Sequence, residues 1–205
     1  MHPDDADWEP WRPERAADLL AGIDVPWAVA AGWAIDLFLG QERREHEDLE
    51  LAVPEARFAE VADRFPMLRF FVVGPGLAAP VDKEPERLAD THQTWALDRE
   101  TGVWRLDVFR EPSEDGQWVF RRDERIRLPY SEVIELSADG IPYVRPEVVL
   151  LFKAKGARPK DESDLSAVLP RLDHERRALL GGWLDLVHPG HFWLPDVRRG
   201  SVSAA

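Results

Sequence analysis

The stretch AGWAIDLFLGQERREHEDLELAV, residues 31–53, predicts a helix and a strand joined by a charged turn. Its end alternates, with apolar side chains on one face and Asp48 and Glu50 on the other, which is the pattern of a half-buried strand. Residues 33–39 fit about two helical turns. The apolar residues 25–32 predict a buried strand that leads into this helix through a glycine turn.

Outward from this stretch, the patterns predict strands in the middle of the chain and helices toward its end. The predicted strands cover residues 68–73, 92–98, 103–111, 118–129, 133–137 and 141–144, the last five pairing antiparallel, with a Gly/Pro-rich loop at 74–80. The predicted helices cover residues 12–21, 54–65, 145–157, 161–172 and 174–187. We therefore expect an α+β protein with a mixed sheet, helices packed on one face, a core over residues 1–144 and a small helical part over residues 145–205 that packs on it as one domain.

The composition limits the classes of partner. The chain has 39 acidic and 26 basic residues and a formal net charge of −13, which argues against nucleic acid and suits a cationic small molecule. The absence of cysteine excludes disulfides and thiolate metal sites. The sequence shows neither a secretory signal nor the roughly 20 apolar residues of a membrane span, so we expect a cytoplasmic protein without a membrane partner. Nine tryptophans indicate aromatic packing, and a ligand-stacking role stays open for one or two of them.

Two carboxylates converge on the predicted acidic strand. Residues two apart project from the same face, so Asp48 and Glu50 point toward one place above the sheet. Their mutual repulsion is relieved by a hard divalent cation such as Mg²⁺. Asp107, in the segment RLDVF, alternates correctly to add a third carboxylate from a neighbouring strand, an arrangement used for in-line displacement at phosphorus. The alternative interpretation is a polar strand face exposed to water.

Gly32 supplies a second feature of a phosphate site. A glycine between a strand and a helix lets the backbone approach a ligand, and the N-terminus of the helix presents free N–H groups to phosphate oxygens. The sequence therefore predicts that the phosphates of a nucleoside triphosphate lie beside the acidic strand. Asp36, in the middle of the predicted helix among apolar neighbours, is interpreted as a structural residue hydrogen-bonded to the backbone or to an arginine.

These motifs resemble those of a known group of enzymes. The Gly-Trp-Ala, Asp, Gly and Arg-x-His-x-Asp elements within residues 31–53 are similar to the signature of the aminoglycoside and lincosamide adenylyltransferases, nucleotidyltransferases of the DNA-polymerase-beta-like superfamily. Residues 146–165, PEVVLLFKAKGARPKDESDL, resemble the helix of these enzymes that carries Lys-x-Lys and Lys-Asp-x-x-Asp pairs. A hydrophobic-Asp-Val-Phe strand lies between the two segments, so the resemblance covers residues 26–165.

The resemblance implies an activity and a set of site residues. The implied reaction is the magnesium-dependent transfer of a nucleoside monophosphate from a nucleoside triphosphate to a hydroxyl of a small, aminoglycoside-like acceptor. Asp48 and Glu50 are implied as metal ligands, and Asp107 as a third ligand or as the base that takes the acceptor's proton. The residues implied in nucleotide binding are Gly32, Trp33, Arg44, His46, Lys153 and Lys155.

Some positions depart from the family pattern. Ala31 stands where the family has glycine, no serine follows Gly32, and Glu50 replaces the commoner aspartate. These departures leave open a non-catalytic member that binds a nucleotide or a partner protein, an enzyme that modifies protein, or a binding module whose acidic cleft holds a cation. For Lys153 and Lys155 the alternative is a solvated helical face with local ion pairs. The sequence also leaves open the base of the nucleotide and the oligomeric state.

Overall fold

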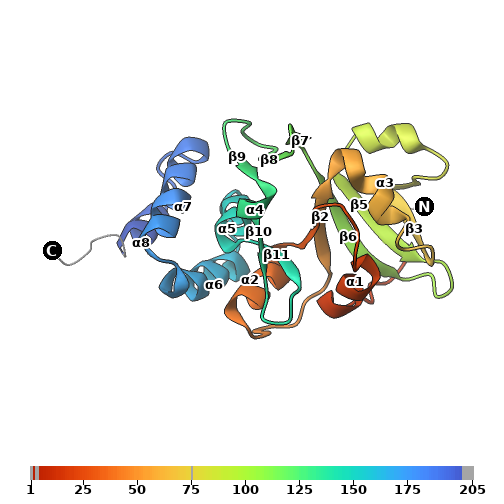
Figure 1. The fold of residues 1–205 in the computed structure, drawn as a ribbon, viewed down its shortest axis with the longest axis horizontal. Helices are drawn as coiled ribbons and strands as arrows, with labels where there is room; N and C mark the ends of the chain where they lie inside the picture. Colours follow the sequence, from red (N-terminus) through yellow and green to blue (C-terminus); the bar gives the residue numbers. More distant parts are fainter. Residues whose placement is uncertain (1, 3–4, 75, 200–205) are drawn as a thin grey trace.

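The computed structural model describes residues 2, 5–74 and 76–199, which form one large mixed sheet, a small second sheet and a set of helices (Figure 1). The large sheet contains, in spatial order, β10 (Ile134–Leu136), β11 (Pro142–Val144), β1 (Ala28–Val29), β2 (Glu50–Pro54), β6 (Trp104–Glu111), β5 (Gln93–Asp98), β3 (Leu68–Gly74) and β4 (Leu77–Pro80). The small sheet contains β7 (Ser113–Glu114), β8 (Gln117–Val119) and β9 (Arg127–Pro129).

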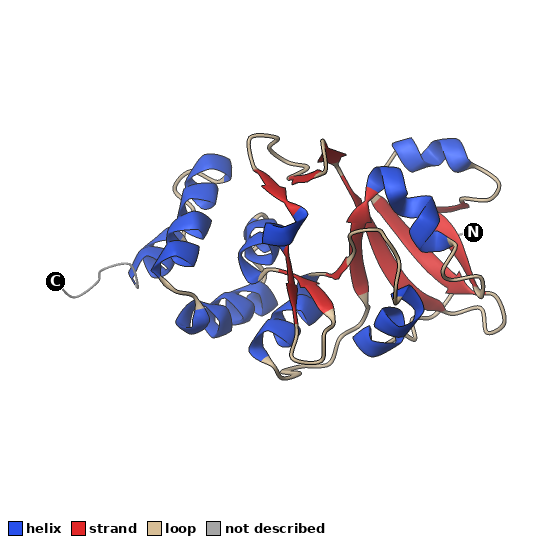
Figure 2. Cartoon of the chain, in the orientation of Figure 1, coloured by secondary structure: helices blue, strands red, loops and turns tan. Residues whose placement is uncertain are grey.

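Helices lie at both ends and in the middle of the elongated molecule (Figure 2). The α-helices are α1 (Pro13–Leu20), α2 (Ala31–Leu39), α3 (Phe58–Ala62), α4 (Tyr130–Val133), α5 (Pro146–Ala154), α6 (Pro159–Val168), α7 (His174–Val187) and α8 (Leu194–Arg199). Short 3₁₀ turns are η2 (Glu55–Arg57), η3 (Pro85–Ala89) and η4 (Leu169–Arg171). Helices α6, α7 and α8 gather at the end of the molecule opposite β3 and α3 (Figure 1). The predicted α+β fold with a mixed sheet and a helical C-terminal part is confirmed, whereas the division at residue 144 stays a prediction.

The centre of the sheet is built by a parallel pair. Strands β2 and β6 run parallel, and their register sets Glu50 opposite Asp107 and Leu51 opposite Val108. Because side chains alternate along both strands, the carboxylates share one face of the sheet and the apolar side chains share the other. The prediction of antiparallel pairing is correct for β5 and β6 but incomplete, because the other edge of β6 pairs in parallel with β2.

Aromatic packing covers the apolar face of the sheet. Phe58 of α3 meets Phe70 of β3 edge to face, with ring centroids 5.4 Å apart, and Phe65 lies 6.4 Å from the same ring. Arg64 ties α3 to α1 by donating to the carbonyl oxygens of Leu19 and Ala21. These contacts leave the carboxylate-bearing face of the sheet free to form a site.

Several predicted boundaries are wrong for identifiable reasons. Residues 77–80 of the predicted loop form β4, because they pair antiparallel with β3. The predicted strand 118–129 is divided into β8 and β9, because its middle forms a turn in which the Phe120 N–H donates to the Ile126 carbonyl at 2.9 Å. Helix α6 begins at Pro159, two residues before the predicted start, and α8 was not predicted.

The start of α2 also differs from the prediction. The predicted strand 25–32 is reduced to the two-residue strand β1. Its last two residues belong to the helix, which begins at Ala31 rather than at Trp33. Ala31 has φ 47°, in the left-handed region that favours glycine, whereas Gly32 does not need this freedom. The position where the family that the sequence resembles has glycine is therefore the position with positive φ.

No helix among the described residues is long and apolar enough to cross a membrane.

We predict that Ala31→Gly stabilises the protein. Left-handed backbone costs a non-glycine residue roughly 1–2 kcal/mol, and glycine removes this cost. Glycine also gives the unfolded chain more conformational freedom, which destabilises the folded protein by roughly 0.4–1 kcal/mol. The expected gain in the free energy of unfolding is about 0.5–1 kcal/mol, measured by urea denaturation. Ala34→Gly, in the same helix but with ordinary helical backbone, is the control and is expected to destabilise. Equal destabilisation by both substitutions would show that Ala31 is not strained.

Candidate active site

Three carboxylates converge at the centre of the sheet. One oxygen from each of Asp48, Glu50 and Asp107 lies within 4.8 Å of the other two. Asp107 is almost fully buried, whereas Asp48 and Glu50 are half-buried at the start of β2. The site depends on the parallel register of β2 and β6, which sets Glu50 directly opposite Asp107.

Burial and mutual repulsion disfavour the ionised forms of the three carboxylates. Burial, and then the charge of Asp48, raise the pKa of Glu50 to about 7. Burial raises the pKa of Asp48 as well, and burial together with Glu50 raises the pKa of Asp107 well above its ordinary value. A group of hard oxygen donors that repel one another fits a divalent cation such as Mg²⁺.

The two carboxylate oxygens of Asp107 differ in their hydrogen bonding. Gln93 Nε2 on the neighbouring strand β5 donates to Asp107 Oδ2 at 2.6 Å. The buried Oδ1 atom has no hydrogen bond of normal geometry among the described residues, although the Trp95 side chain lies close enough to Asp107 to oppose the rise in its pKa. A buried oxygen in this state is costly unless a proton, a cation or a ligand completes it, so the donor set fits a metal or a substrate hydroxyl.

Gly32 lies in the first turn of α2, beside the acidic strand. Its backbone N–H donates to Glu50 and opposes the rise in the pKa of that residue. A Cβ added to Gly32 would lie 2.9 Å from His46 and still closer to the Arg44 guanidinium. The glycine is therefore required by two side chains of its own chain, in addition to the approach to a ligand that the sequence predicted.

Trp33, Arg44 and His46 form a cluster around this glycine and do not line the cavity described below. The His46 ring stacks on Trp33 with centroids 4.2 Å apart, and its Nε2 lies 2.8 Å from Asp36 Oδ2. The predicted structural role of Asp36 is confirmed, because this carboxylate also accepts bonds from the Arg43 backbone N–H at 3.1 Å and from its Nε at 2.9 Å. The predicted role of the cluster in nucleotide binding stays a prediction.

The two predicted lysines have different surroundings. Lys153 Nζ lies 3.0 Å from both Asp161 and Asp164, so the ion pairs of the alternative interpretation are present, but they are buried and do not form a solvated face. Lys155 is exposed at the end of α5. Arg158, which the sequence analysis did not select, pairs with Asp161 at 2.9 Å. All three cations line the same cavity as Glu50.

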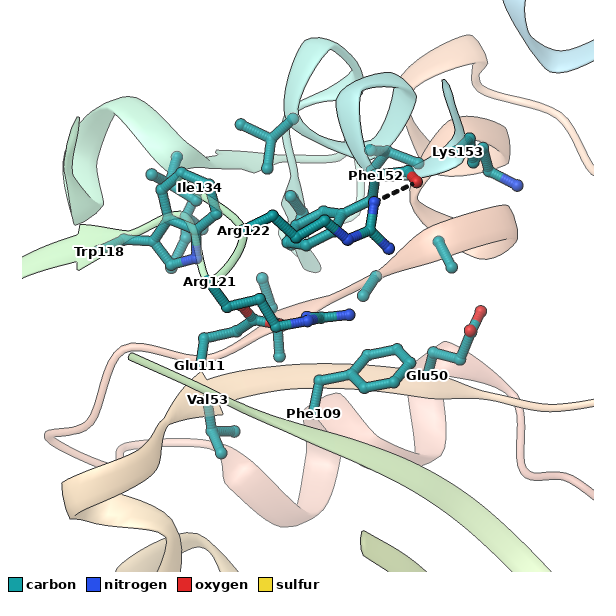
Figure 3. Close-up of a pocket in the computed structure, with 18 of the residues that line it drawn as sticks. Glu50, Val53, Phe109, Glu111, Trp118, Arg121, Arg122, Ile134, Phe152 and Lys153 are labelled. Carbon is teal, nitrogen blue, oxygen red and sulfur yellow. Dashed lines mark hydrogen bonds and ion pairs between the residues drawn. The ribbon is translucent and has the colours of Figure 1, made fainter. Parts of the chain in front are cut away.

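A cavity of about 500 Å³ extends from Glu50 between the sheet and α5 (Figure 3). Glu50 and Lys153 lie at one end of it, and Trp118 and Ile134 lie at the other. Its wall is largely apolar, with Ala52 and Phe109 on the strands and Phe152 on α5. Its cationic side chains are Arg121, Arg122, Lys153, Lys155 and Arg158.

Arg121 and Arg122 were missed by the sequence analysis. The Arg121 guanidinium lies 5.3 Å from the centroid of the Phe109 ring and 4.4 Å from that of Phe152, and it pairs with the buried Glu111. Arg122 Nη1 donates to the Phe152 carbonyl at 2.8 Å. The only feature of the sequence that could have indicated their role is that the two arginines are adjacent. The segment that contains them was interpreted as an ordinary strand. The apolar, cation-lined shape of the cavity fits a planar ring that carries negative charge at one end.

The chain matches one family model. The model described as aminoglycoside-2''-adenylyltransferase matches residues 14–126, which hold β1, α2 and all three carboxylates. The comparison with curated proteins finds no match.

Three solved structures are similar to this fold. The lincomycin-bound lincosamide antibiotic adenylyltransferase LnuA is 17% identical, with a TM-score of 0.53 and alignment over 76% of this chain and 92% of that chain. The solution structure of the antibiotic-resistance factor ANT(2'')-Ia is 18% identical, with a TM-score of 0.52 over 82% of this chain and 84% of that one. The crystal structure of ANT(2'')-Ia with adenylyl-2''-tobramycin is 18% identical, with a TM-score of 0.54 over 85% of this chain and 94% of that one. At these identities the likeness shows the fold.

We predict that Gly32→Ala destabilises the protein. The new Cβ would press on His46 and Arg44, and overpacking of this kind costs roughly 1–3 kcal/mol in the free energy of unfolding. Gly182→Ala in α7 is the matched control, because its Cβ meets nothing within 4 Å and alanine favours the helix by roughly 0.5–1 kcal/mol. Urea denaturation of both variants checks the prediction, and a Gly32→Ala protein as stable as the control would contradict it.

We predict that Glu50→Gln stabilises the metal-free protein at alkaline pH. A carboxyl whose pKa rises on folding, here to about 7, destabilises the fold when ionised, so this cost appears as the pH rises from about 4.5 to 7. In EDTA at pH 8 the variant should be more stable by an amount on the order of 1 kcal/mol, and the gain should disappear near pH 4.5. Urea denaturation at both pH values measures this, and an equal gain at both would exclude titration of Glu50 as its cause.

Proposed function

The chain belongs to the aminoglycoside-2''-adenylyltransferase family, and we propose that it transfers a nucleoside monophosphate from ATP or another nucleoside triphosphate to a hydroxyl of a small cationic acceptor. The observation that carries this proposal is the cluster of Asp48, Glu50 and Asp107, of which Glu50 lines a largely apolar cavity that also carries the cations Lys153, Lys155 and Arg158. Family membership alone supports an adenylyltransferase, and the geometry supports the assignment of roles to residues.

The carboxylates would hold Mg²⁺. Asp48, Glu50 and Asp107 supply hard oxygen donors, and the pKa of Glu50, raised to about 7 by burial and by Asp48, supports a cation as their partner. When bound, the metal ion would neutralise this cluster and the charge that develops on the phosphoryl oxygens.

The nucleotide would occupy the cavity. Lys153, Lys155 and Arg158 line it near Glu50 and are placed to bind the triphosphate. The apolar walls between Phe109 and Phe152 suit the nucleoside. The N-terminus of α2 adds backbone N–H groups at the same end of the site.

Asp107 would act as the base. The acceptor oxygen forms a bond to the α-phosphorus, the bond between that phosphorus and the pyrophosphate oxygen breaks, and the hydroxyl proton passes to the Asp107 carboxylate. The bond from Gln93 holds Asp107 Oδ2 in place, so the buried Oδ1 is the oxygen that would take the proton. Pyrophosphate leaves toward the lysines, where its charge is stabilised.

We predict that ATP binds only with Mg²⁺ and that Asp48→Asn weakens this binding at least about tenfold, because a metal ligand is removed. Calorimetric titration of ATP with Mg²⁺ and with EDTA measures the effect. Asp63→Asn, the same change of charge at an exposed position after α3, is the control.

The wild type and Asp107→Asn should be tested for transfer of radiolabelled AMP to tobramycin. Transfer by the wild type and its loss in Asp107→Asn support the proposed reaction. Magnesium-dependent binding of ATP with no transfer to any hydroxylated acceptor supports the non-catalytic alternative. Failure of every triphosphate to bind contradicts the proposal.

A further inference from the structure

The two sides of the carboxylate cluster differ in chemistry. On the side of α5 and α6, the cations Lys153, Lys155 and Arg158 line the cavity next to Glu50. On the side of β5, the residue in register with Asp107 is Trp95. Since Glu50 and Asp107 are register partners as well, the row Glu50, Asp107, Trp95 crosses three strands on one face of the sheet.

Trp95 belongs to an aromatic cluster that lies apart from the main core. Its ring centroid lies 5.1 Å from that of Trp8 and 5.4 Å from that of Trp104, and Phe71 lies 5.3 Å from Trp104. Phe71 and Trp104 are buried, whereas Trp8 and Trp95 are half-buried and form part of the surface. The cluster therefore places the Trp95 ring next to Asp107 and the Trp8 ring next to Trp95.

The N-terminal segment is fixed to this place by backbone hydrogen bonds. The Trp104 N–H donates to the Asp7 carbonyl at 2.8 Å, the Glu9 N–H donates to the Trp104 carbonyl at 3.0 Å, and the Trp11 N–H donates to the Arg105 carbonyl at 3.1 Å. Trp8 is thus held as a short parallel extension next to β6. It lies before residue 14, where the match to the family model begins, so it is a feature of this chain beyond that match.

We propose that Trp95 and Trp8 form the acceptor platform, which binds an amino sugar with the C–H face of its ring against Trp95 and an ammonium group near an indole face. This assignment rests on the proposed function. Attack in line with the leaving pyrophosphate requires the acceptor to enter opposite the phosphates. If the triphosphate lies on the side of Lys153, the acceptor approaches Asp107 from the side of Trp95.

The chemistry of the platform suits a cationic sugar. Tryptophan is the best of the aromatic side chains for cation–π interactions, and its indole offers a large apolar surface to a ring. The exposed acidic side chains of Asp5 and Asp7 lie near Trp8 in the sequence, Glu9 is paired with Arg105, and the chain has a net charge of −13, so the field of the protein attracts cations. An anionic or wholly apolar acceptor would gain nothing from this surrounding charge.

The test compares tryptophan variants of the full chain with tobramycin as the probe. Trp95→Leu is expected to raise the KM for tobramycin at least about tenfold, which is the size of a cation–π contact plus lost ring area. It should change the Kd for ATP with Mg²⁺ by a clearly smaller factor, because the ring lies away from the cations and touches only Asp107 of the three carboxylates. Trp95→Phe should restore part of the affinity, and Trp8→Ala should raise the KM by a smaller factor.

Trp11→Leu is the matched control. Trp11 packs against Phe65 on the other face of the sheet, with centroids 6.0 Å apart, so its removal should not change the KM for tobramycin. Thermal unfolding confirms that each variant is folded before its kinetics are compared.

The outcomes separate the platform from the proposed function. An unchanged KM in Trp95→Leu, with ATP binding and AMP transfer intact, overturns the platform and leaves the proposed function standing. A wild type that binds ATP with Mg²⁺ but does not bind tobramycin overturns the assignment of an amino sugar. Failure to bind ATP at all contradicts the proposed function, and the platform fails with it.

Discussion

The mutual repulsion of Asp48, Glu50 and Asp107 is the constraint on which the rest of the structure depends. Three carboxylates with oxygens within 4.8 Å of one another oppose folding unless a cation or protons compensate them. The parallel pairing of β2 with β6 enforces this proximity, because its register sets Glu50 opposite Asp107. The aromatic packing on the opposite face of the sheet, including Phe58 against Phe70, supplies stability that offsets the cost.

A chain of ion pairs connects α2 and the segment that follows it to helices α5 and α6. Asp36 of α2 accepts from Arg43, which also pairs with Asp164 of α6. Asp164 in turn pairs with Lys153 at 3.0 Å, a cation that lines the cavity. This chain fixes the cationic wall relative to the carboxylates. It also explains why a loop rich in charges follows α2, since buried charges are retained only when they are paired.

The local pattern of the sequence predicted those parts of the site that depend on alternation. Asp48 and Glu50 share a face because they are two residues apart, and Asp107 was placed by its apolar neighbours. The parallel pairing that brings the two strands together is a long-range contact, and no local pattern contains it. Trp8 was not selected because it lies in a proline-containing acidic segment without periodicity, and its place is fixed only by backbone bonds to β6.

The arginines were missed for a different reason. A strand pattern over residues 118–129 hid the turn that carries Arg121 and Arg122 into the cavity. The predicted start of α2 is wrong because Gly32 indicated a turn before the helix. The residue with positive φ is instead Ala31, which already belongs to the helix. Both errors arose where tertiary contacts override local propensity.

The central claim is that the three carboxylates hold a divalent cation that positions a triphosphate. The most direct measurement is anomalous diffraction from crystals grown with Mn²⁺ and a non-hydrolysable ATP analogue. This account predicts an anomalous peak bounded by Asp48, Glu50 and Asp107, with the phosphates of the analogue on the side of Lys153. An analogue bound with no peak at the carboxylates, or a peak elsewhere, would contradict it.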